Sequence, residues 1–251
     1  MTIRRSAAFV TAIVLVAACS SSSSKGATPT TVGNSGGTAT VSPTQPPVTN
    51  ANGVVTIGSN TPLTSGTKYA VANTALQASI EFTASDVSKQ AFITPGFFGI
   101  AADTNGAEPL AAFIDLANSR VFRDPHVDFT KFANAGDVLN ATDPVPAEFL
   151  TFLAHLPGMT VGVPSSTTFL GVPATSVTYK VDSVDGGFQC GSDNPAPCLL
   201  VLFVTTGPTI ALHTGDSGTL YALQVSGRRL LVEVTDHAGA TDLLKTFTFG
   251  A

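Results

Sequence analysis

Short runs in which apolar and polar residues alternate dominate the sequence from about Gly53 to its end. Every second residue from Leu76 to Phe82 is apolar, and a similar alternation runs from Thr175 to Val181. Alternate side chains of a strand point to opposite faces of a sheet, so both runs predict half-buried strands. Residues 199–204 are continuously apolar, which favours a central strand covered on both faces. The sequence therefore predicts a fold organised around a β-sheet.

The clearest pair of strands lies near the C-terminus. Residues 219–225 and 228–235 are joined by Ser226 and Gly227, and a two-residue connection with glycine in second place is typical of a tight hairpin turn. Leucine and valine at alternate positions of the second strand are predicted to face one side, with Glu233 on the other.

Helical patterns are few. Residues 146–156 have a proline in the first turn, leucines and phenylalanines on one face, and Pro157-Gly158 at the end, which predicts a helix. A shorter helix is predicted at 240–245, before a strand at 246–249. Because no repeated β-α-β pattern is present, we predict an α+β domain, with an antiparallel sheet and one or two helices packed on one face.

The N-terminus has the features of an export signal. Arg4 and Arg5 precede an apolar run over residues 7–18, which spans roughly 18 Å and is too short for a bilayer core of about 30 Å. The run ends in Val16-Ala17-Ala18-Cys19, which resembles a bacterial lipobox. In that family of signals the cysteine thiol receives a diacylglyceryl group, cleavage follows on its N-terminal side, and the new amine usually receives an acyl chain such as palmitate.

The resemblance implies lipidation at Cys19 and a location on the outer face of the cell membrane. Acyl chains contribute about 0.8 kcal/mol per buried CH₂, so several of them anchor a protein without a spanning helix. An ordinary signal peptide and a twin-arginine export signal are the alternatives, although Ser6-Ala7-Ala8 fits the latter poorly.

A low-complexity segment follows the anchor. From Ser20 to Asn52, 22 of 33 residues are Ser, Thr, Pro or Gly, and Lys25 is the only charged residue. Such a composition cannot bury a core and predicts a disordered linker with a reach of roughly 30 Å. The predicted organisation is a signal peptide at 1–18, the lipidated cysteine and linker at 19–52, and one domain at 53–251.

Composition excludes several functions. Charged residues make up 12% of the chain and the formal net charge is −5, so nucleic-acid binding through phosphate neutralisation is not expected. Phosphate-binding loops and dinucleotide glycine fingerprints are absent from the sequence, and no cofactor is predicted.

Two cysteines remain once Cys19 is lipidated. Cys190 and Cys198 flank a turn-rich loop, and an even number of cysteines in an oxidising compartment predicts a disulfide, worth about 2–3 kcal/mol by loop closure. Metal binding by two thiolates without a nearby histidine, and redox chemistry at a spacing far from Cys-x-x-Cys, are the weaker alternatives.

No catalytic pattern is complete. Gly215-Asp216-Ser217-Gly218 reproduces four letters of the trypsin-like nucleophile motif, but the residues after it differ and the histidine segment of that family is missing. A turn between strands is therefore predicted there, with Ser217 as the alternative nucleophile and no catalytic residue assigned.

Other candidate residues are scattered. The four histidines stand at 126, 155, 213 and 237, with none at helical metal-binding spacing, so no metal site is predicted. The densest polar cluster is Asp124-Pro125-His126-Val127-Asp128. The apolar run Pro95 to Ile100 favours a core strand, with a ligand-lining surface as the alternative.

The second half of the chain resembles an unnamed domain of actinobacterial exported proteins and lipoproteins. The resemblance covers residues 146–251 and rests on four motifs, while the tryptophan usual in the helix is replaced by phenylalanine. These motifs are Ala154-His155-Leu156-Pro157, Gly171-Val172-Pro173, the pair Cys190 and Cys198, and the strand residues Val225 to Val232. The order of elements is also similar to the PsbP-like fold. The resemblance implies fold and location, and no activity.

Two functions remain open, with a hydrolase using Ser217 as a third. The first is a membrane-anchored extracytoplasmic lipoprotein acting as a non-enzymatic binding module, with an envelope protein, the cell wall or a lipid as partner. The second is a carrier of a lipid or other apolar ligand, motivated by 16 phenylalanines and few charges. Mycobacterial lipid-carrying lipoproteins share the anchor, linker and α+β content, but no residue motif.

Overall fold

The computed structural model describes residues 48–50, 53–58, 60–73, 78–104, 109–132, 134–184, 189–190 and 196–250. It is mostly β-structure, with 51% strand and 12% helix, so the predicted α+β class is wrong. The three α-helices of the described part are only five or six residues long: α1 (Ala135–Asn140), α2 (Phe149–Leu153) and α3 (Ala240–Leu244). None of the helices described is long and apolar enough to cross a membrane.

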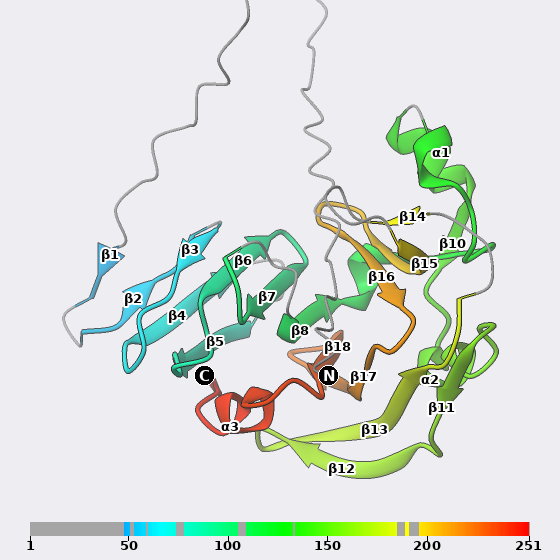
Figure 1. The fold of residues 1–251 in the computed structure, drawn as a ribbon. Helices are drawn as coiled ribbons and strands as arrows, with labels where there is room; N and C mark the ends of the chain where they lie inside the picture. The colour runs from blue at the N-terminus through cyan, green and yellow to red at the C-terminus, as the bar shows by residue number, and fades with distance from the viewer. Residues whose placement is uncertain are drawn as a thin grey trace, which may run out of the picture.

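A nine-stranded antiparallel sheet, here called the central sheet, forms the middle of the molecule (Figure 1). Its strands, in spatial order, are β11 (Met159–Val161), β13 (Val172–Val181), β17 (Ser217–Val225), β18 (Arg228–Thr235), β8 (Pro109–Asp115), β7 (Phe97–Ala101), β6 (Gln90–Thr94) and β3 (Thr61–Pro62). The ninth strand, β12 (Ser165–Phe169), also pairs with β13.

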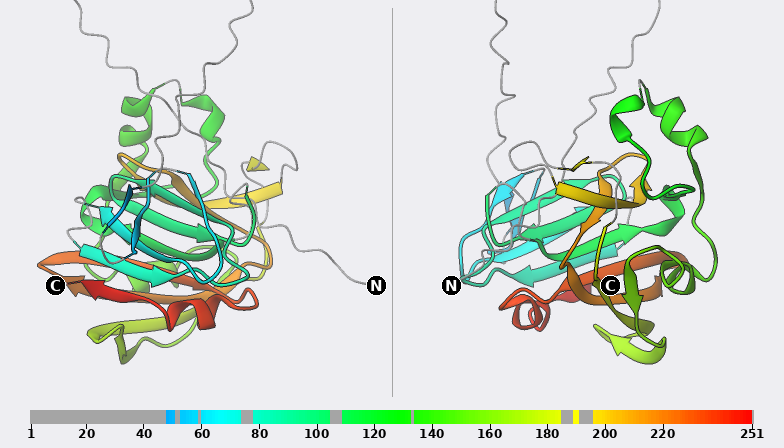
Figure 2. Two further views of the ribbon diagram at one scale, coloured as in Figure 1. Left: turned by 90° about the vertical axis from the view of Figure 1, so that its left-hand side faces the viewer. Right: turned by 45° about the vertical axis from the view of Figure 1, so that its right-hand side comes forward.

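Two smaller sheets accompany it. The N-terminal sheet contains β1 (Val48–Thr49), β2 (Val55–Thr56), β4 (Lys68–Asn73), β5 (Ala78–Thr83) and β19 (Thr248–Gly250). The second, here called the disulfide sheet, contains β10 (Thr142–Pro144), β9 (Ser119–Phe122), β15 (Ala196–Val204), β14 (Gln189–Cys190) and β16 (Thr209–His213). Figure 2 shows these groups of strands from two further sides.

One core lies between the N-terminal sheet and the central sheet. Its centre is aromatic: the Phe98 and Phe113 rings are 5.5 Å apart, and those of Phe82 and Phe247 are 5.0 Å apart. Aliphatic residues from both sheets complete this cluster. The alternate residues of β8 and β18 point the other way, so the central sheet needs a second cover.

The second core lies on that opposite face, between the central sheet and the disulfide sheet. Leu220 and Leu231 of the central sheet belong to the same buried cluster as Leu199 and Val201 of β15. Helix α2 adds its own buried apolar residues to this cluster. The helix covers part of a core that is mainly sheet against sheet, which is why the predicted packing of helices on one face is incorrect.

Several predicted elements are present at the expected places. The hairpin of β17 and β18 turns at Ser226 and Gly227, whose φ angles are 50° and 79°, as a two-residue type I′ turn requires. The helix predicted at 146–156 is shorter, spanning Phe149–Leu153. The strand predicted around Pro95 to Ile100 is β7, and all five of its residues are buried, so the core-strand interpretation is confirmed.

Candidate functional site

The predicted lipidation site, Cys19, lies outside the described residues, as does most of the predicted linker at 19–52.

Cys190 and Cys198 form a disulfide in the structure, with their Cα atoms 5.8 Å apart. Both residues are buried in a small cluster with Phe122, Val138 and Leu200 on the outer side of the disulfide sheet. The bridge ties β14 to β15, and its position inside an apolar cluster indicates a structural role.

The Gly215 to Gly218 segment is the predicted turn, between β16 and β17. The Asp216 carboxylate accepts the His213 backbone N–H at 2.7 Å, and its Oδ2 atom lies 3.6 Å from His213 Nδ1. Ser217 begins β17 and is in register with Lys180. No hydrogen bond joins Ser217 to His213 in the described part of the chain, so these residues do not form a catalytic triad there.

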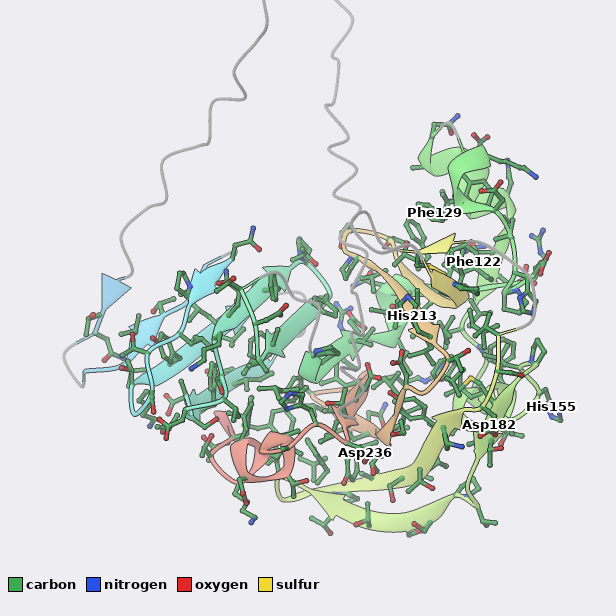
Figure 3. All side chains as sticks on the ribbon, in the orientation of Figure 1. Phe122, Phe129, His155, Asp182, His213 and Asp236 are labelled. Carbon is green, nitrogen blue, oxygen red and sulfur yellow. A yellow bond between two sulfur atoms is a disulfide. The ribbon has the colours of Figure 1, made fainter. Side chains whose placement is uncertain are left out.

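The histidines do not converge. His155 follows α2 near β11, whereas His213 ends β16 (Figure 3). In the Asp124 to Asp128 loop the Asp124 carboxylate accepts the His126 backbone N–H at 2.9 Å. Within the described ranges, no group of three or more His, Cys, Asp or Glu side chains is placed to hold a metal ion.

A buried acid that the sequence analysis assigned no role lies in the second core. Glu233 in the middle of β18 is only 5% exposed, and its Oε1 atom accepts a hydrogen bond from the hydroxyl of Tyr179 in β13. The strand between them is β17, where Gly218 stands in register with Tyr179 and with Thr235. Two polar side chains from non-adjacent strands thus meet inside an apolar layer.

Burial dominates the electrostatics of this pair. The pKa of Glu233 is raised to about 7, mainly by loss of hydration. The hydrogen bond from Tyr179 lowers this pKa, and the negative charge of Asp216 raises it. Burial, together with the negative charge of Glu233, raises the pKa of Tyr179 well above its usual value. At neutral pH, Tyr179 is therefore a donor, and Glu233 is divided between its neutral and ionised forms.

Near this pair, His213 is 6% exposed, and its buried Nε2 atom has no hydrogen-bond partner among the described residues. Asp216 connects the two features, because it contacts His213 and acts electrostatically on Glu233 and Tyr179. The polar cluster of Tyr179, Glu233, Asp216 and His213 forms where the turn between β16 and β17 meets β13 and β18.

A different kind of feature is the outer edge of the central sheet. Both β11 and β12 pair with β13, and no strand of the described structure pairs with their other side. Between β11 and β12, the Gly162 backbone N–H donates a hydrogen bond to the Thr178 carbonyl of β13 at 2.8 Å. Residues 159–169 therefore run along β13 as one interrupted edge.

This edge segment, residues 159–169, contains no charged residue. Val163 is 89% exposed, and Ser165 to Thr168 are all exposed. At the β11 end of the edge, Lys180 and Asp182 form an ion pair. The edge therefore offers backbone groups and hydroxyls to a partner, without charges of its own.

Comparison with known proteins found no match to this chain among family models, curated proteins or solved structures.

Proposed function

We propose that this protein is a membrane-anchored extracytoplasmic lipoprotein whose β-domain is a non-enzymatic binding module. The observation that carries the proposal is the open, uncharged edge segment at residues 159–169. Its partner is an envelope protein that presents an extended segment.

The chemistry of a strand edge supports this partner class. An edge strand has a row of N–H and C=O groups that a further strand can pair with, and natural proteins usually block it with lysine, proline or a bulge. Here Pro164 interrupts the edge once, and β12 carries only hydroxyl side chains before Phe169. Extended peptides bind such edges by adding a strand.

The part of the proposal that concerns the lipid anchor and the linker rests on the sequence alone. Lipid on Cys19 would hold the chain at the outer membrane face, and a linker of the predicted reach would lift the domain clear of the headgroups. The partners within reach are then other molecules of the cell envelope. The membrane itself is contacted through the lipid.

The carrier hypothesis receives no comparable support. The hypothesis was based on the phenylalanine content. In the structure, four of these rings pack against one another in the first core: Phe82, Phe98, Phe113 and Phe247. These rings contribute to folding, so the phenylalanine content no longer argues for a ligand.

Photo-crosslinking in cells tests the binding edge. Thr167→p-benzoylphenylalanine places a crosslinker on exposed β12, and Asn140→p-benzoylphenylalanine places the same group on exposed α1 as the control. We expect an adduct with another polypeptide at position 167 only. An adduct of twice the chain mass, a lipid-sized adduct, no adduct, or equal adducts at both positions would contradict the proposal.

A further inference from the structure

The Glu233–Tyr179 pair has no part in the proposed binding edge, and its position suggests a separate role. Glu233 stands between Ala112 of β8 and Leu220 of β17 in the strand register, and both neighbours are buried and apolar. Its side chain belongs to the face of the central sheet that the disulfide sheet covers. A charge at this position lies between two packed sheets.

The groups that surround Glu233 decide how it responds to pH. Tyr179 on β13 is its hydrogen-bond donor, and Asp216 on the turn before β17 is a second acid. His213 on β16 lies against Asp216. Asp236, which follows β18, adds negative charge near Tyr179.

The cations on the two strands that carry Glu233 and Tyr179 have other partners. Arg228 Nη1 is 3.1 Å from Asp115, Arg229 donates to the carbonyls of Pro146 and Ala147, and Lys180 pairs with Asp182. In the described structure Glu233 takes part in no salt bridge. An ionised Glu233 therefore has one donor, and no cation to offset the loss of hydration.

We propose that Glu233 and Tyr179 form a proton-dependent latch between β13 and β18. With a proton on Glu233, the pair is neutral, hydrogen-bonded and compatible with the apolar layer. Loss of the proton places an uncompensated charge between the central sheet and the disulfide sheet and weakens their packing. The domain thus senses the pH of the compartment in which it works.

Chemical unfolding of the full chain between pH 4.5 and 8 tests the latch. A carboxyl group whose pKa is higher in the folded than in the unfolded state stabilises the fold below its unfolded pKa, and this stability is lost as pH rises through the folded pKa. As the pH rises from 4.5 to about 7, ionisation of Glu233 should raise the unfolding equilibrium constant on the order of 10²-fold. Above the folded pKa, this contribution should level off.

The Glu233→Gln variant keeps the shape and an acceptor for Tyr179 but cannot ionise, so this contribution to the pH dependence should disappear. Glu81→Gln removes a carboxylate that pairs with Lys68 on the N-terminal sheet, and it should retain the wild-type rise. His213→Asn removes the imidazole that lies against Asp216, and it should also retain the wild-type rise.

Equal pH dependence in wild type and Glu233→Gln would overturn the proposal. If the glutamine variant does not fold, the carboxyl carbon of Glu233 can be titrated in the wild-type protein by ¹³C NMR. A midpoint near 7 supports the latch, and a midpoint near 4.5 overturns it.

Discussion

Two carboxylates that are buried in the described part of the chain are accommodated in different ways. Asp115, at the end of β8, is fully buried and accepts hydrogen bonds from Ala117 N, Asn118 Nδ2 and Arg228 Nη1 at 2.7 to 3.1 Å. Among the described residues, Glu233 has Tyr179 as its only donor. Hydrogen bonds and an opposite charge compensate for lost hydration. Asp115 has both, whereas burial with a single donor favours the protonated form of Glu233.

Removing the hydroxyl of Tyr179 tests this reading of the pair. Tyr179→Phe keeps the ring but leaves a buried acceptor without its donor, so the free energy of unfolding should fall by about 1–3 kcal/mol at pH 5. The loss should be larger at pH 8, where the ionised carboxylate depends on that donor more strongly. Urea unfolding at the two pH values measures both.

Tyr221→Phe is the matched control. The Tyr221 ring packs against Phe169 in a tilted arrangement, with the ring centroids 4.5 Å apart. Its hydroxyl makes no hydrogen bond in the described structure. Its removal should change stability by less than about 0.5 kcal/mol. A loss for Tyr179→Phe that is the same at pH 5 and pH 8 would argue against a carboxylate that titrates between them.

At the scale of elements, the sequence predicted best where the local pattern was strong. The β17–β18 hairpin followed from its Ser226-Gly227 turn, and β15 followed from its apolar run. Strands such as β7 were harder to delimit, because burial on both faces removes the alternation on which the prediction depends. Glu233 was missed for a related reason: alternation placed it opposite the apolar face of β18, and a local pattern cannot show that a second sheet covers that face.

The close approach of β17 and β18 at Gly218 allows a prediction about how these strands pack. A Cβ atom added to Gly218 of β17 would lie 2.3 Å from the Val234 carbonyl oxygen of β18, so Gly218→Ala must push the strands apart beside the Tyr179–Glu233 pair. We expect a loss of about 1–3 kcal/mol in unfolding free energy.

Gly58→Ala is the control, because a Cβ atom there meets nothing within 4 Å. Thermal unfolding of both variants makes the comparison. Similar melting temperatures for Gly218→Ala and wild type would contradict the close approach of β17 and β18 at Gly218.

At the scale of the whole molecule, three sheets in layers replace the single sheet with helices that the sequence predicted. The helical segments were placed correctly but are too short to form a layer, and the first core depends on N-terminal strands of two to six residues. Such short strands carry little periodic signal, so the sequence could predict a β-rich chain more readily than its layering. The disulfide was predicted from the number of cysteines and from the oxidising compartment that the predicted export signal would imply.

The central proposal is that this β-domain works at the outer membrane face on a lipid anchor, and it rests on the predicted export signal. The envelope partner and the compartment whose pH would act on Glu233 both depend on it. The direct measurement is detergent phase partitioning of wild type and Cys19→Ser, with intact masses of each. Wild type should enter the detergent phase with the mass of the acylated chain that begins at Cys19. Cys19→Ser lacks the thiol that receives the lipid, so it should remain an uncleaved precursor or be released into the medium. If Cys19→Ser still enters the detergent phase at the mature mass, the lipid anchor is contradicted.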